Sequence, residues 1–122
     1  MSKKKYLPKS FESIGGQTLS ANLYASMLQS KAYKSLSNGA RTLYTFMKLQ
    51  YYGAKGIKDH DKTDFYFNWA LANKTYSLYT NNTQFKKDRD MLVEYGFIEV
   101  VENGKSSRTK NIYRFSDKWK II

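Results

Sequence analysis

Two segments of the sequence carry side chains suited to binding a polyanion. Residues 81–87 combine amides and a hydroxyl, which can hydrogen-bond to base edges, with two lysines: Asn81, Asn82, Thr83, Gln84, Lys86 and Lys87. Residues 103–110 place compact hydroxyls between three cations: Lys105, Ser106, Ser107, Arg108 and Lys110. Cations neutralise phosphates and release counterions, whereas amides and hydroxyls reach into grooves. Both segments are therefore candidate contacts to double-stranded DNA.

The two segments differ in net charge. Residues 81–95 hold three cations and three carboxylates, so their net charge is zero. Residues 103–111 hold three cations and no carboxylate, a net charge of +3. We therefore expect the second segment to contribute at least as much binding free energy as the first. An arginine-bearing tip suits entry into a minor groove or contact along a phosphate ridge.

The composition of the whole chain agrees with a polyanionic partner. The 122 residues include 21 Lys+Arg and 10 Asp+Glu, for a net charge of +11. Most of this excess lies in residues 1–58, at +9, and residues 59–122 carry +2. Hydrophobic residues make up 41%, enough for one folded domain with a core. The absence of cysteine excludes disulfides, thiolate metal sites and thiol nucleophiles.

Catalytic and metal chemistry have little support. The single histidine, His60, stands among Asp59, Asp61 and Asp64, but this spacing fits no established metal-binding loop. We expect a solvated loop there, with no metal, no cofactor and no enzymatic activity. No apolar run approaches the length of a membrane span, and no apolar stretch follows the N-terminal lysines. These features predict a cytoplasmic protein with no membrane association.

The periodicity predicts the elements that must position the two segments. We expect a basic, flexible tail over residues 1–19 and one domain over residues 20–122. Within it we expect a short helix or turn-rich segment (20–33), a helix capped by Ser37 and ended by Gly53, a strand (65–67), a brief helix after Asn68 (69–74), a turn (76–79), a helix ended by Gly96 (81–95), and two strands (97–101 and 111–115). Trp119 is expected to pack on the hairpin that the last two strands form.

This order of elements is that of a winged helix-turn-helix domain, an α+β fold with a three-helix core and a C-terminal β-hairpin. In such a domain the second and third helices form the DNA-reading pair, and the hairpin is the wing. The predicted third helix would present residues 81–87 to a major groove. The wing would present residues 103–110 to the flanking backbone or minor groove.

Three stretches carry a resemblance to a known family: "SKAYKSLSNGARTLYTFMKLQYYG", "FKKDRDMLVEYGFIEVVENG" and "NIYRFSDKWK". From about Tyr24 to Trp119 the chain resembles the winged-helix domains of replication-initiator and conjugative-transfer proteins of Gram-positive plasmids. The resemblance implies recognition of a short site at an origin of transfer or replication, with a relaxase or an initiator as protein partner. The family's initiators continue into a second domain, whereas this chain ends after the wing, so we expect an accessory role.

Three alternative functions stay open. A transcriptional repressor on the same fold would need a dimer matched to a palindrome; no helix stands out for dimerisation, although a homo-oligomer on DNA is compatible with the sequence. A protein-interaction module would bind DNA weakly and without sequence preference. A single-strand or RNA binder would stack exposed tyrosines on bases, but we expect the core to contain Tyr44, Tyr51, Tyr95 and Tyr113.

Overall fold

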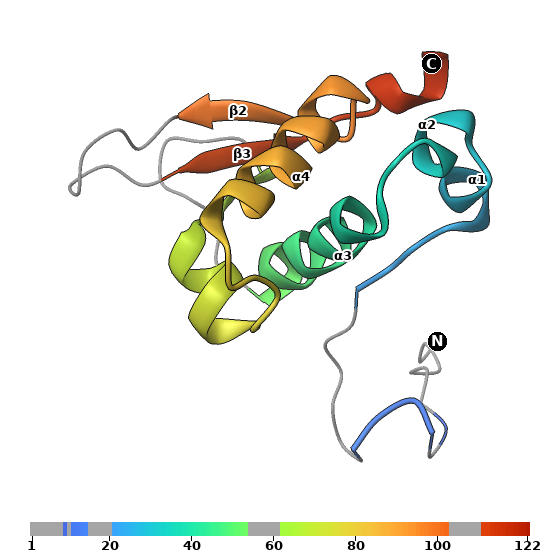
Figure 1. Ribbon diagram of the computed structural model, residues 1–122. Helices are drawn as coiled ribbons and strands as arrows, with labels where there is room; N and C mark the ends of the chain where they lie inside the picture. The colour runs from blue at the N-terminus through green and yellow to red at the C-terminus, as the bar shows by residue number, and fades with distance from the viewer. Residues whose placement is uncertain (1–8, 10, 15–20, 54–61, 103–110) are drawn as a thin grey trace.

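The computed structural model describes residues 9, 11–14, 21–53, 62–102 and 111–122. The helices and strands of these segments are shown in Figure 1. In chain order they are α1 (Ala25–Leu28), α2 (Lys31–Lys34), α3 (Asn38–Gly53), β1 (Asp64–Tyr66), η1 (Leu71–Thr75), α4 (Asn82–Glu94), β2 (Ile98–Glu102), β3 (Ile112–Phe115) and η2 (Lys118–Ile121). Together they form a mixed α+β fold, as the periodicity predicts.

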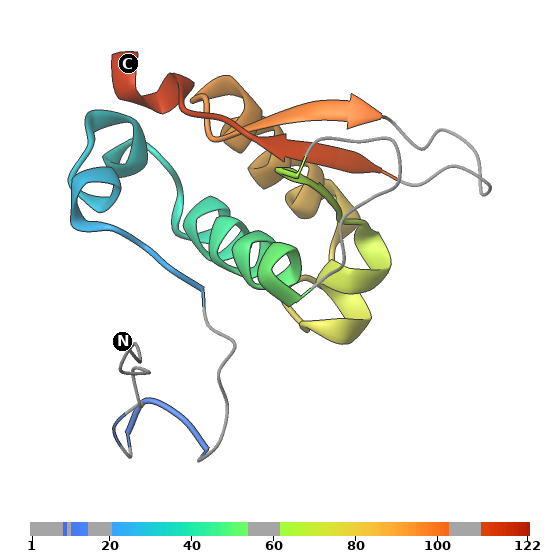
Figure 2. The same ribbon diagram turned by 180° about the vertical axis from the view of Figure 1, so that it is seen from behind.

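The strands of the described segments form one antiparallel sheet in the order β1-β3-β2. Asp64 of β1 lies opposite Arg114 of β3, and Ile98 of β2 lies opposite Phe115. The β2–β3 register shifts between Val100 and Glu102, an irregularity that increases the local twist of a hairpin. Helix α3 packs against α4 and β1, and α4 packs against β2. Figures 1 and 2 show α3 and α4 crossing beside the sheet.

Helix α3 follows directly from its sequence. Ser37 precedes it and accepts a hydrogen bond at Oγ from the backbone N–H of Ala40, at 3.1 Å. This confirms the predicted N-cap, which satisfies one of the amides that the first turn leaves unpaired. The inward face of the helix is formed by Ala40, Leu43, Tyr44 and Met47, all buried, at the spacing of one helical stripe. The helix extends at least to Gly53, the last described residue of this segment, so the predicted end there is not tested.

Of the two alternatives for the segment before α3, the structure agrees with the turn-rich one and not with a single short helix. The segment forms two single-turn helices, α1 and α2, separated by Ser30. The Ser30 hydroxyl accepts a hydrogen bond from the Tyr33 N–H at 3.1 Å and donates to the Met27 carbonyl at 2.6 Å. One side chain therefore closes the first turn and caps the second, because serine competes with the backbone for local hydrogen bonds. The expected tail, residues 1–19, lies largely outside the described residues.

The brief helix after Asn68 is confirmed, with a wider turn than predicted. The Asn68 Oδ1 accepts from the Leu71 N–H at 2.9 Å, so Asn68 is the expected cap. Residues 69 and 70 are α-helical, and η1 continues as a π-helix in which the Tyr76 N–H reaches the Leu71 carbonyl at 2.9 Å. Ser77 follows at φ 54° and reverses the chain toward α4.

The core lies where the helices meet the sheet. Its largest fully buried side chains are Tyr113, Phe65, Phe67, Phe97, Leu43, Met47, Leu92 and Ile98. Trp119 closes one side: its ring stacks on Phe97 at 6.1 Å between centroids. This contact confirms the expected packing of Trp119. Tyr44 and Tyr113 are buried, and Tyr51 and Tyr95 pack against the core, as predicted for these four tyrosines.

Within the described ranges, no helix has the length and apolar character that a membrane crossing requires.

Candidate nucleic-acid interface

The structure places every predicted reading residue of α4 at the surface. The side chains that the sequence singles out at this helix are all exposed: Asn81, Asn82, Thr83, Gln84, Lys86 and Lys87. Phe85 lies between them and is buried at 2% exposure, and it anchors the first turn of α4 in the core. The first two turns of α4 therefore present a polar surface of fixed orientation.

Two of these side chains are already used by the helix itself. The Asn81 Oδ1 accepts from the backbone N–H groups of Thr83, at 2.8 Å, and Gln84, at 3.4 Å, so Asn81 is the N-cap. The Gln84 Nε2 donates to Asp88 Oδ1 at 3.1 Å. Both residues are held in one orientation by these bonds, which limits what each can offer to an outside partner. Asn82, Thr83, Lys86 and Lys87 are the predicted reading residues with no such tie among the described contacts.

The solvent face of α4 is divided by charge along the helix. Lys86 and Lys87 lie in the N-terminal half, whereas Asp90 and Glu94 lie in the C-terminal half. Arg89 does not offset this division, because its Nη2 pairs with Asp90 Oδ1 at 3.1 Å. A polyanion is attracted to the first two turns of α4 and repelled from the last two. The zero net charge of residues 81–95 therefore conceals a cationic half.

Asp88 is a residue that positions α4 and that composition alone did not identify. It is buried at 2% exposure and accepts three hydrogen bonds. They come from Tyr79 Oη at 2.6 Å, Gln84 Nε2 at 3.1 Å and Ser37 Oγ at 3.2 Å. Burial, and then the hydrogen bond to Asp88, raise the pKa of Tyr79 above its ordinary value, so the phenol remains a donor. Asp88 therefore ties α4 to the first turn of α3.

The approach of the two helices at this point is close. A Cβ added to Gly39 would collide with the Asp88 carboxylate, so any larger residue there would displace that carboxylate. A pocket of about 330 Å³ opens beside the contact and is lined by residues that include Ser37, Tyr79 and Asp88. Within the described part of the chain, no buried side-chain nitrogen or oxygen lacks a hydrogen-bond partner. The hydrogen bonds among Ser37, Tyr79 and Asp88 therefore fix how α4 lies against α3.

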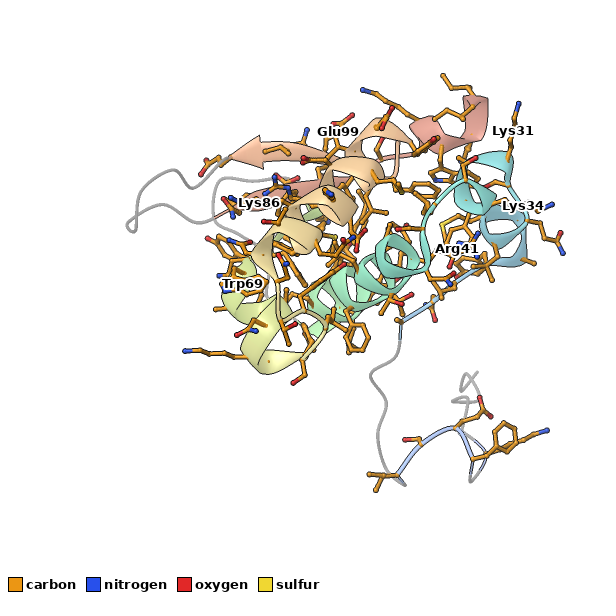
Figure 3. The ribbon with its side chains drawn as sticks, viewed as in Figure 1. Lys31, Lys34, Arg41, Trp69, Lys86 and Glu99 are labelled. Carbon is orange, nitrogen blue, oxygen red and sulfur yellow. The ribbon has the colours of Figure 1, made fainter. Side chains whose placement is uncertain are left out.

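Trp69 is a further residue of this surface, and the sequence predicts for it only a place on the brief helix over residues 69–74. It opens the helix before α4 and is half-buried against Phe85, at 5.9 Å between ring centroids. Phe85 immediately precedes Lys86, and Figure 3 shows Trp69 and Lys86 toward the same end of the molecule. The indole N–H has no acceptor among the described contacts and is not fully buried. It is therefore a donor available beside the cationic half of α4.

The basic tip lies outside the described residues: Lys105, Ser106, Ser107, Arg108 and Lys110. The flanking strands are described, and they connect to the rest of the site. The Asn111 carbonyl accepts from the Phe67 N–H at 3.2 Å, which joins the start of β3 to the residue just after β1. Residues 103–110 therefore connect two strands whose positions are fixed by the same sheet that carries α4.

Only part of the loop that contains the single histidine and its neighbouring carboxylates lies within the described residues. Asp59, His60 and Asp61 lie outside the described residues, whereas Asp64 is buried at 3% exposure. Asp64 accepts from both Arg114 Nε, at 2.7 Å, and Arg114 Nη2, at 3.3 Å. This two-point ion pair joins β1 to β3. Among the residues that the structure describes, no group of three metal-binding side chains comes together.

Comparisons with protein-family models, with curated proteins and with solved structures gave no match.

Proposed function

We propose that this chain is a winged helix-turn-helix protein that binds double-stranded DNA through the N-terminal half of α4 and the segment between β2 and β3. The supporting topology is the order α3, β1, the helix over residues 69–75, α4, β2 and β3, with β3 central in the sheet. In that reading α4 is the recognition helix, and its N-terminal residues meet base edges. The observation that carries the proposal is the exposed, cationic first half of α4 (Figure 3).

The role that we propose for this binding is an accessory one on a plasmid or other mobile element. The chain would recognise a short site at an origin of transfer or replication, next to a relaxase or an initiator. This part of the proposal depends on the sequence resemblance. A titration at near-physiological salt, with a library of duplexes from the element against random competitor, tests it. A discrete site beside a nick site or an origin supports the role, and a site at a promoter favours a repressor. No preference over random duplex contradicts specific binding and favours a protein-interaction module.

Removal of two cations from α4 tests the interface directly. We expect Lys86→Ala with Lys87→Ala to lower duplex affinity about tenfold or more and to reduce the slope of log K against log salt by about 2, because each lysine neutralises one phosphate. Fluorescence anisotropy at several salt concentrations measures both quantities. Lys9→Ala with Lys62→Ala removes the same charge from exposed positions outside α4 and α2 and is the matched control. Equal losses in the two double variants would contradict a contact made by α4.

Trp69 provides a local probe of the same surface. In a Trp119→Phe variant, Trp69 is the only tryptophan, and we expect duplex added up to one equivalent to quench its emission and to protect it from acrylamide. The physical reason is that DNA seated on Lys86 covers the neighbouring indole. In a Trp69→Phe variant the remaining Trp119, stacked on Phe97, is expected to show no change over this range. A response from Trp119 alone would place the first DNA contact elsewhere.

A further inference from the structure

A second cationic surface lies on the helices that precede α4. Residues 21–53 contain four cations and no carboxylate: Lys31, Lys34, Arg41 and Lys48. None of these four takes part in an ion pair among the described residues. The charge of this segment is therefore not neutralised by carboxylates within the described part of the fold.

Two of the four cations are engaged internally. The Arg41 Nε and Nη2 donate to the carbonyls of Tyr33, at 3.2 Å, and Lys34, at 3.0 Å, and the guanidinium lies 5.1 Å from the Tyr33 ring centroid. The Lys48 Nζ donates to the Asn22 carbonyl at 3.1 Å. Arg41 and Lys48 thus hold the segment of α1 and α2 on α3. The other two, Lys31 and Lys34, are exposed and have no carboxylate partner in the described structure.

Helix η2 packs beside α2 and adds charge to the same region. Lys120 is exposed, and its Nζ lies 5.7 Å from the ring centroid of Trp119. Lys118 pairs with Glu99 at 2.9 Å, and Asp117 is the carboxylate that precedes η2. We call Lys31, Lys34 and Lys120 the α2–η2 surface. Among the described residues, Asp117 is the carboxylate near this surface that has no ion pair, so the three lysines leave the surface with a net positive charge.

The α2–η2 surface and the cationic half of α4 lie at different ends of the molecule. Figures 1 and 2 show α2 and η2 together at one end, away from η1 and the start of α4. In Figure 3, Lys31 and Lys34 project outward at the end opposite Lys86 and Trp69. Charges further apart than the Debye length, about 8 Å at physiological salt, are largely screened from one another, so we treat the two ends as separate surfaces.

We propose that the α2–η2 surface binds the phosphates of a second DNA duplex, so that one chain joins two DNA segments. This inference rests on the proposed function, in which the first duplex is held by α4. The exposed cations of the surface are all lysines, which act as point charges without the planar fork that arginine presents to base edges. The second contact is therefore made to the backbone and carries no sequence preference. It holds any nearby duplex to the one that α4 reads.

Capture of a second duplex tests the inference. The full chain is bound to an immobilised duplex, and retention of a labelled free duplex is measured. Two charge-reversal variants with the same net charge are compared: Lys31→Glu with Lys34→Glu, and Lys86→Glu with Lys87→Glu. We expect the α2 variant to keep the affinity of the parent for the immobilised duplex within about threefold and to lose capture of the second duplex by about tenfold or more. We expect the α4 variant to lose binding to the immobilised duplex itself. Circular dichroism confirms that both variants remain folded.

The outcomes separate this inference from the proposed function. A parent chain that binds the immobilised duplex but captures no second duplex overturns the inference and leaves the proposed function standing. Capture that persists in the α2 variant assigns bridging to self-association of the chain and also overturns it. Equal loss of first-duplex affinity in both variants merges the two surfaces into one interface. A parent chain that binds no duplex at all removes the proposed function, and the inference falls with it.

Discussion

Replacement of Asp88 by alanine is expected to lower the free energy of unfolding by about 2–4 kcal/mol. The carboxylate is 2% exposed and accepts from Tyr79, Ser37 and Gln84. Its removal leaves the Ser37 hydroxyl and the Gln84 amide without this acceptor at the contact between two helices, and leaves the Tyr79 hydroxyl only the Gly39 carbonyl at 3.2 Å. A buried donor without a partner loses its hydration and gains nothing in exchange. Chemical denaturation of the two proteins measures the difference.

Two further variants separate this role from a general effect of charge. Asp90→Ala removes a carboxylate from the same helix, but Asp90 is 69% exposed, so we expect a change within about 0.5 kcal/mol. Asp88→Asn is expected to lie between the two. Its Oδ1 still accepts from Ser37 and Gln84, and the Tyr79 hydroxyl can donate to the Gly39 carbonyl, 3.2 Å away. Equal destabilisation by the Ala substitutions at 88 and 90 would show that Asp88 does not join the helices.

Asp88 also shows why some of the fold could be predicted and some could not. Its spacing from Phe85 and Leu92 puts it on the inward face of α4, and that spacing is readable in the sequence. Its partners are Tyr79 in the turn before the helix and Ser37, which lies 51 positions away. A capping serine can be recognised from local pattern, but the acceptor that its hydroxyl meets is fixed only by how α3 and α4 cross.

Features that depend on a few neighbouring residues, such as helix caps, were predicted well from the sequence. The predicted start of α3 and both ends of α4 agree with the structure to within about a residue, because caps and apolar periodicity act within a few positions. Each strand begins one residue from its predicted start, since strand ends are set by cross-strand pairing. Asp64 begins β1 because it lies opposite Arg114. From the sequence, Asp64 could be grouped only with its neighbours in the acidic loop, and its partner lies 50 positions away.

The candidate interface also has features that the sequence predicts and features that depend on tertiary packing. Exposure of the first turn of α4 follows from the position of Phe85 on the opposite face. The internal bonds of Asn81 and Gln84 reduce the set of side chains that can read a base, and the bond from Gln84 to Asp88 depends on tertiary burial of that carboxylate. The availability of Trp69 depends on where the helix over residues 69–75 meets α4. The packing of these two helices against each other is set by the core. Periodicity could therefore place Trp69 on a helix but could not place it beside Lys86.

Gly96 is a position where an added methyl group is expected to have a large effect. It follows α4 at φ 82°. Its N–H donates to the Val93 carbonyl at 3.2 Å, and the Phe97 N–H donates to the Leu92 carbonyl at 3.0 Å. This pair of bonds is a Schellman motif, which needs a left-handed residue at its centre. It ends α4 and turns the chain into β2, as the sequence predicts for this glycine.

The surroundings of Gly96 add a steric cost to the conformational cost of any side chain at this position. A Cβ there would lie 2.6 Å from the Trp119 nitrogen and 2.7 Å from the Lys118 carbonyl carbon, both backbone atoms that cannot rotate away. The Trp119 N–H also donates to the Gly96 carbonyl at 3.1 Å, which holds η2 against this turn. We therefore expect Gly96→Ala to lower the free energy of unfolding by about 2–5 kcal/mol, from left-handed strain and overpacking together.

A second variant distinguishes backbone strain from the steric collision. Asparagine tolerates a positive φ better than alanine, so Gly96→Asn retains the steric collision with less strain. If the collision dominates, both variants are destabilised to a similar extent and the emission of Trp119 changes, because η2 is displaced from Phe97. If strain dominates, Gly96→Asn recovers most of the stability and the Trp119 emission of the parent.

Ser77→Gly relieves a left-handed non-glycine residue at φ 54° and serves as the opposite control, with an expected gain of up to about 1 kcal/mol in the free energy of unfolding. A Gly96→Ala protein as stable as the parent would contradict both the backbone strain and the steric collision, and with them the close approach of η2 to the end of α4.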